Sequence, residues 1–178
     1  MKTRLFIASM FCAVSLRAEE AAAPAPEPRR ITLNGQTFEL ANSTSGENIA
    51  TEEYVLSGEK LATWTQLVTV QRITLAKPGS PDEFTAYFQK KISQESGARL
   101  DLLQQGRAAC VFSAYFARSD QNDEQMMVCL VFSEVKTPQV LNLIQYAIKP
   151  NQLAQSVVEL QLKAWKAQFS QQALSMVR

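Results

Sequence analysis

Alternating apolar and polar positions predict strands along much of the chain after residue 30. The alternation is clear at 64–75, where Trp64, Gln66 and Val68 share one side and β-branched residues are frequent. Further strands are predicted at 53–56, 99–104, 108–117, 126–135 and 140–148. The last run could also form a helix, but Lys149-Pro150 closes it and favours a strand.

A short hairpin precedes these strands. Residues 31–33 and 36–40 flank Asn34-Gly35, the residue pair that supplies the two positive-φ positions of a type I′ turn. A polar loop is predicted at 42–48. Another polar loop joins the strands at 108–117 and 126–135, so those two strands should form an antiparallel pair.

The pattern changes to a helical period in two places. Ser80, Pro81 and Glu83 fit the N-cap, N1 and N3 positions of a capping box, and the helix should end near Ser96 with Gly97 as its C′ residue. The second helix should run from about 152 to 176, capped by Asn151. The order of strands, helix, meander and helix predicts an α+β domain at 31–178, with helices packed on an antiparallel sheet.

Aromatic residues on this second helix allow two interpretations. Trp165 and Phe169 recur at helical spacing together with Val158, Leu162 and Met176. With Trp64 they could line a partner or ligand surface, but such residues more often form a core. Six glutamines give the same helix a polar, weakly charged side: Gln152, Gln155, Gln161, Gln168, Gln171 and Gln172. That side could bind a partner, although packing within the chain is the default.

The N-terminus predicts export. Residues 1–18 combine Lys2 and Arg4 with a 12-residue apolar run, which suits a signal peptide and is too short to span a bilayer. Cleavage is expected after Ala18 or within 21–23. Residues 19–30 are rich in Ala and Pro and predict a disordered spacer. We expect a periplasmic or secreted protein with no transmembrane segment after residue 30.

Composition excludes several classes of chemistry. The chain has no histidine, which removes Ser-His-Asp and Cys-His nucleophiles and the common His-containing zinc sites. A formal net charge of +1 argues against nucleic-acid binding. No glycine-rich phosphate loop occurs. The sequence therefore predicts no catalytic residue, no metal site and no cofactor.

Two short motifs have better ordinary explanations. Ser57-Gly58-Glu59-Lys60 matches the S-x-x-K nucleophile motif, but its companion elements are missing and a turn explains it. Asp120, Asn122 and Glu124 alternate like the start of a calcium loop, yet the glycine at position 6 and the glutamate at position 12 are absent.

Cys110 and Cys129 follow the signal peptide and lie on adjacent predicted strands, on the same face of the sheet. If the strands pair so that the two cysteines face each other, they can form a disulfide in an oxidising compartment. If Cys110 instead faces Ser133, the sulfurs are too far apart to bond. Two reduced core cysteines are the alternative, and a redox-active pair is not indicated because no C-x-x-C occurs.

Residues 53–71 resemble a segment of uncharacterised exported bacterial proteins, with the pattern E-Y-x3-G-E-x-L-x2-W-x2-L-V-T-V-Q. Pro81, Glu83 and Phe84 also fit the helix start of that group. The element order is similar to the PsbP/Mog1-like α/β/α sandwich, a fold of binding and assembly factors. The resemblance covers roughly residues 50–148. It implies a fold and an exported location, and it brings no catalytic residue.

Three functions follow from these features. The first is an exported, non-enzymatic domain that binds a protein or a small apolar ligand in the cell envelope. The second is an envelope assembly protein that docks through its C-terminal helix. The third is a hydrolase with a site that contains no histidine. We predict the first, with no enzymatic activity and an unknown partner.

Overall fold

The structure is a computed structural model that describes residues 29–94, 97–117, 123–134 and 137–176. The signal peptide predicted at 1–18 and nearly all of the spacer predicted at 19–30 lie outside the described residues. The last two residues of the predicted spacer are described. Arg29 forms an ion pair with Glu52, and Arg30 is the first residue of a strand.

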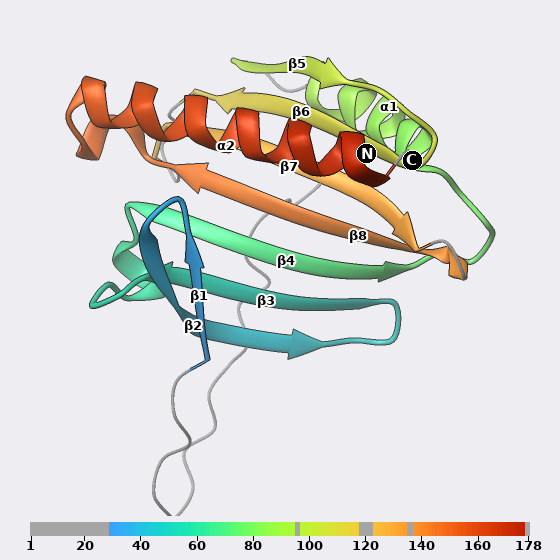
Figure 1. The fold of residues 1–178 in the computed structure, drawn as a ribbon, viewed down its shortest axis with the longest axis horizontal. Coiled ribbons are helices and arrows are strands. Elements are labelled where there is room, and N and C mark those ends of the chain that lie inside the picture. Colours follow the sequence, from blue (N-terminus) through green and yellow to red (C-terminus); the bar gives the residue numbers. More distant parts are fainter. Residues whose placement is uncertain (1–28, 95–96, 118–122, 135–136, 177–178) are drawn as a thin grey trace, which may run out of the picture.

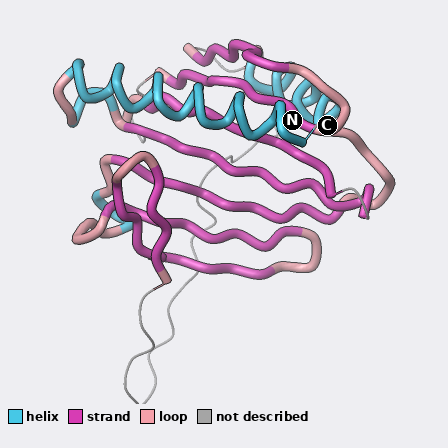
Figure 2. The backbone as a smooth tube through the Cα atoms, viewed as in Figure 1, coloured by secondary structure: helices cyan, strands magenta, loops and turns pink. Residues whose placement is uncertain are grey.

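Eight antiparallel strands form one sheet in the order β1-β2-β3-β4-β8-β7-β6-β5 (Figure 1). Their bounds are β1 Arg30–Leu33, β2 Gln36–Ser45, β3 Ile49–Leu56, β4 Gln66–Thr74, β5 Ala98–Gln104, β6 Ala109–Phe116, β7 Gln125–Glu134 and β8 Thr137–Ile148. The strand favoured over a helix at 140–148 is thus confirmed. The central pair, β4 and β8, joins two runs of hairpin-connected strands (Figure 2).

The β1–β2 hairpin has the predicted turn. Asn34 and Gly35 both have positive φ, at 49° and 74°. Leu33 pairs with Gln36, and Ile31 pairs with Phe38. The Asn-Gly pair therefore fixes the register that places Ile31 on the same side as the buried Phe38.

The polar loop predicted at 42–48 was largely wrong. β2 continues to Ser45 and β3 begins at Ile49, so only three residues connect them. Ser43 pairs with Glu52, and Thr44 pairs with Thr51. These strand ends are solvent-exposed or half-buried, so polar side chains are tolerated there and the apolar alternation that marks a strand is lost.

Helix α1 runs from Pro81 to Ile92 with the predicted capping box, in which the Ser80 N–H donates to Glu83 Oε2 at 3.1 Å. Its predicted end was too late, because the helix closes at the C-cap residue Ser93. Gly97 has a φ of 76° but lies directly before β5 rather than next to the helix end. Its positive φ therefore serves the entry into the strand.

Helix α2 runs from Gln155 to Met176. Asn151 was predicted to cap it, but Asn151 lies inside the short 3-10 helix η2, Pro150–Gln152. Pro150 fixes a helical φ at the start of that turn, and Leu153 then returns to an extended conformation. A second short 3-10 helix, η1, Leu61–Thr63, precedes β4 and leaves Trp64 outside the strand.

The two helices pack on opposite faces of the sheet, which confirms the predicted α+β class and its α/β/α layers (Figure 1). Trp165 and Phe169 of α2 join Val68, Val128 and Tyr146 in one core cluster. Ile92 of α1 joins the other cluster, which contains Phe112 and Val131. Both helices make their main contacts with β5, β6 and β7. Within the described residues, neither helix is long and apolar enough to cross a membrane.

Candidate functional site

Trp165 and Phe169 belong to the core and not to a binding surface. Both side chains are fully buried. Trp165 stacks on Tyr146 with ring centroids 4.5 Å apart and meets Phe38 edge-on at 6.4 Å. Phe169 packs edge-on against Trp165 at 5.2 Å. The chain's own sheet covers both residues, so the core interpretation is correct and neither residue is available to a ligand in this structure.

Trp64 lies in a polar cluster beside the central strands. The Lys149 ammonium lies 4.7 Å from the centre of the Trp64 ring and 2.9 Å from Asp123 Oδ2. Gln152 also donates to Asp123 Oδ2, at 3.1 Å. Lys149 is nearly buried, with 11% of its side chain exposed. The half-buried ring therefore covers a buried cation, which is a structural role that needs no external partner.

Cys110 and Cys129 are free and buried, and no disulfide forms between them. Both predicted registers were wrong by two residues, in opposite directions. Cys110 pairs with Val131, and Cys129 pairs with Phe112. The two cysteines are thus diagonal neighbours on one face, with Cα atoms about 7–8 Å apart. A disulfide needs a closer approach. Burial also raises the pKa of the Cys129 thiol.

The short motifs do not assemble a reactive centre. Ser57 lies in the turn after β3, and its hydroxyl donates to Glu39 Oε1 at 2.9 Å. The Glu59 N–H donates to the Leu56 carbonyl at 2.8 Å, which supports the turn interpretation of S-x-x-K. Asp120 and Asn122 lie outside the described residues. In the described part of the chain, no three acidic or sulfur-bearing side chains gather in a way that could hold a metal ion.

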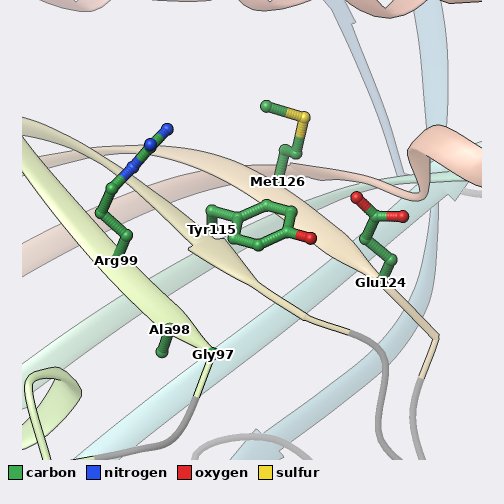
Figure 3. A pocket seen from close by; sticks show the side chains of 6 residues that line it. All are labelled: Gly97, Ala98, Arg99, Tyr115, Glu124 and Met126. Atoms are coloured by element: carbon green, nitrogen blue, oxygen red, sulfur yellow. The ribbon is translucent and has the colours of Figure 1, made fainter.

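A pocket of about 490 Å³ lies beside the start of β5 (Figure 3). Its lining residues come from β5, β6, β7 and the residues directly before β5 and β7: Gly97, Ala98, Arg99, Tyr115, Glu124 and Met126. A hydrogen bond from Tyr115 to Glu124 raises the pKa of the Tyr115 phenol. The phenol is therefore more firmly protonated at neutral pH than a free tyrosine, which suits a hydrogen-bond donor and not a base.

The outward side of α2 carries a second apolar row that sequence reasoning missed. Steps of three and four residues connect its members, which are Val157, Leu160, Ala164, Ala167, Gln171 and Leu174. We call these six residues the outer row. Leu160 and Leu174 are 65% and 58% exposed. The charged residues of α2 within 155–176 are Glu159, Lys163 and Lys166, and none of them is in the row.

Glutamines separate the outer row from the buried side of α2. Gln161, Gln168 and Gln172 follow one another in steps of seven and four residues, next to Trp165 in the helical projection. Their amide oxygens are buried and have no hydrogen-bond partner among the described residues. The outer row thus has an amide border on one side and Lys163 on the other. Such a surface contains no group that could start a reaction, but it can pack against another helix.

The outer row escaped prediction because its centre is weakly hydrophobic. Ala164, Ala167 and Gln171 lie between the apolar ends, so the row lacks the run of large residues that marks the buried side. Its spacing of three and four residues was the available signal. Small residues at Ala164 and Ala167 also permit close approach of a second helix, as at the contact points of packed helices.

Fold and surface define a class: an α/β/α sandwich with an eight-stranded antiparallel sheet and one exposed helix row. The chain belongs to the protein family whose model matches residues 25–149. Helix α2 lies beyond the matched range. No curated protein sequence matches the chain. The residue pattern quoted for 53–71 is not tested by these comparisons and stays a prediction.

Two solved structures have a similar arrangement. The chain is 12% identical to the Saccharomyces cerevisiae Ran-binding protein Mog1p, over 85% of this chain and 93% of that one, with a TM-score of 0.43. A point mutant of Mog1 is 11% identical over 86% of this chain and 94% of that one, with a TM-score of 0.44. Likeness at this level carries no inference about function.

Proposed function

We propose that the chain is an exported, non-enzymatic protein-binding domain of the cell envelope and that the outer row of α2 binds a helix of its partner. The observation that carries this proposal is the exposure of Leu160 and Leu174 on an uncharged side of a helix whose other side is already packed. Large exposed apolar groups that recur on one side of an element are typical of interaction surfaces. The predicted signal peptide supports the envelope location.

The partner helix should be amphipathic. Its apolar side should carry small or aliphatic residues that fit over Ala164 and Ala167, because small residues allow the helix axes to approach closely. Its border should be acidic where it faces Lys163, since opposite charges at helix borders set orientation and partner choice.

Other hypotheses have less support. The small apolar ligand needed Trp165 and Phe169 as lining residues, and both are packed in the core. The hydrolase needed Lys60 one helical turn after Ser57, but Lys60 has an extended backbone before η1, and both side chains are solvent-exposed. The second hypothesis, docking through the C-terminal helix, is part of the proposal. One side of α2 packs on the sheet, and the outer row on another side is exposed and can bind a partner.

Site-specific photo-crosslinking in cells that export the protein tests the proposal. A photoreactive residue at Leu160, Ala167 or Leu174 should crosslink to one and the same protein. The control position is Glu159, which is exposed and adjacent in sequence but lies on the charged side. Leu160→Asp should abolish the crosslink formed at Leu174 without changing the unfolding transition. Equal crosslinking from Glu159, or none from the outer row, would contradict the proposal.

A further inference from the structure

β5 is an edge strand, and its pairing with β6 determines which backbone groups face outward. Ala98 pairs with Phe116, and Leu100 pairs with Ala114. The Ala117 N–H donates to the Gly97 carbonyl at 3.0 Å, so the hydrogen-bonded pairs of this ladder contain the odd-numbered residues of β5. The N–H and C=O groups of Ala98, Leu100 and Leu102 therefore point away from β6, toward the open edge.

Apolar and charged residues alternate along β5, so the two kinds of side chain point to opposite faces of the sheet. Arg99 and Asp101 share the face of the sheet that α2 covers, where their exposed side chains form an ion pair at 3.4 Å. Leu100 and Leu102 share the opposite face, and 40% of Leu102 remains exposed. A register shift between Leu102 and Gln104 ends the regular pairing with β6. The regularly paired part of β5, whose outer edge has no strand partner among the described residues, thus runs from Ala98 to Leu102.

We propose that this edge pairs with the same edge of a second copy of the chain, antiparallel about a two-fold axis at Leu100. In that register Leu100 faces Leu100 of the partner subunit, and Ala98 faces Leu102 of the partner subunit. All three carry outward backbone groups, so they form the hydrogen-bonded pairs. The two sheets then continue as one.

Charge complementarity identifies the occupant as a second copy. The same register places Arg99 opposite Asp101 of the partner subunit and Asp101 opposite Arg99 of the partner subunit. These are non-hydrogen-bonded positions, where opposed side chains approach most closely. A basic residue and an acidic residue flank the central Leu100, so the reversed strand matches itself. Any shift by two residues loses this match.

The dimer should be weak. Five residues of strand edge bury less surface than the roughly 1,200–2,000 Å² of a stable interface. We expect a dissociation constant of about 10–100 µM. It should rise with salt, because about 1 M salt shortens the screening length to about 3 Å. The inference is independent of the proposed function, since it uses β5 and not α2.

Sedimentation equilibrium of the purified chain from about 5 to about 500 µM tests the proposal. The wild type should shift from monomer to dimer across this range. Arg99→Asp and Asp101→Arg should each stay monomeric alone, with at least about tenfold weaker self-association, because each places like charges opposite each other. An equimolar mixture of the two variants should associate, since every facing pair is then opposite in charge.

Two further variants identify the surface. Leu100→Pro should abolish the dimer and leave the fold intact, because it removes an N–H that points to the open edge. Leu160→Asp, which disrupts the outer row of α2, should leave the dimer unchanged. A wild-type chain that stays monomeric at the highest concentration overturns the proposal. The edge of β5 would then be solvated or would pair with a strand of a different protein. A dimer that Leu160→Asp abolishes, or a mixture of the charge variants that fails to associate, also overturns it.

Discussion

The indole of Trp165 lies flat on the phenol ring of Tyr146, with centroids 4.5 Å apart and an interplanar angle of 10°. The Tyr146 hydroxyl in turn donates to Gln66 Oε1 at 2.6 Å. One line of contacts thus connects α2 to β8 and β8 to β4. Burial raises the pKa of the Tyr146 phenol, so this donor stays protonated.

Trp165→Ala should destabilise the domain by about 3–5 kcal/mol, because it leaves a large cavity under α2. The free energy of unfolding from a denaturant titration measures this effect. Leu160→Ala on the exposed side of the same helix is the control and should change the stability by about 0.5 kcal/mol or less. A loss below about 1 kcal/mol for Trp165→Ala would mean that the helix does not pack on the sheet as described.

Tyr146→Phe should cost about 1–3 kcal/mol, because it leaves the buried Gln66 amide oxygen without its donor. The same titration measures it, and Tyr87→Phe is the matched control because Tyr87 is exposed on α1. Gln66→Leu combined with Tyr146→Phe should recover part of the loss, since both partners of the buried bond are then apolar. Equal effects of Tyr146→Phe and Tyr87→Phe would argue against the bond.

Both core thiols should resist labelling in the native protein. Cys110 and Cys129 are buried, Cys110 Sγ contacts the Gly106 carbonyl at 3.3 Å, and burial raises the pKa of the Cys129 thiol. A chromogenic disulfide reagent should modify neither cysteine in buffer and both in denaturant. Their diagonal register also predicts that mild oxidants leave the mass of the folded chain unchanged. Rapid native labelling would contradict the packing of β6 against β7.

Glu52 should add stability that depends on pH. The Tyr54 hydroxyl donates to this carboxylate, and Arg29 forms an ion pair with it, so the pKa of Glu52 lies below its ordinary value. A lowered folded pKa stabilises the native state above the unfolded pKa of about 4.3, and this contribution is lost as the pH falls through the folded pKa.

Glu52→Gln should therefore cost about 1 kcal/mol or less at pH 7, because solvent screens the exposed Arg29 partner, and progressively less as the pH is lowered from about 4 to about 2. Denaturant titrations between these pH values measure the difference. Glu47→Gln, in the exposed β2–β3 turn, is the control. A difference from wild type that stays constant with pH would show that packing, and not charge, makes Glu52 important.

The N-terminus of the exported protein should begin at or near residue 19. The basic n-region and the apolar run at 1–18 predict removal of that segment. Intact-mass spectrometry of the protein from the envelope fraction measures it directly. Replacement of three apolar residues of the run by lysine should retain the full-length chain in the cytoplasm. An exported protein that keeps Met1 would contradict the prediction.

Local signals in the sequence predicted local structure well. Asn34-Gly35 determines the first hairpin, and the residues from Ser80 to Glu83 determine the start of α1, because turn and cap chemistry depend on a few neighbouring residues. The polar ends of β2 and β3 escaped prediction because they belong to strands only through their pairing with each other.

Register and surface were harder to predict. Alternation correctly placed Cys110 and Cys129 on one face, but any slip of two residues preserves that pattern, so the pairing of Cys110 with Val131 could not be chosen from the sequence. For α2, the large residues at Trp165 and Phe169 correctly indicated the buried side. The centre of the outer row consists of two alanines and a glutamine, which do not mark an apolar side in the sequence. The row can be recognised only when the structure shows which side of α2 is buried.

The pairing of β4 with β8 affects how the chain acquires its structure. Gln66 and Tyr146 meet across 80 residues of sequence, and these two strands form the middle of the sheet. Closure of so long a segment is slow, and β4 has no partner on that side until β8 has emerged from the ribosome. The sheet can therefore be completed only after most of the chain has been synthesised. For a chain that carries the predicted signal peptide, we expect this delay to favour translocation, because the complete sheet cannot form before its last strand has been synthesised.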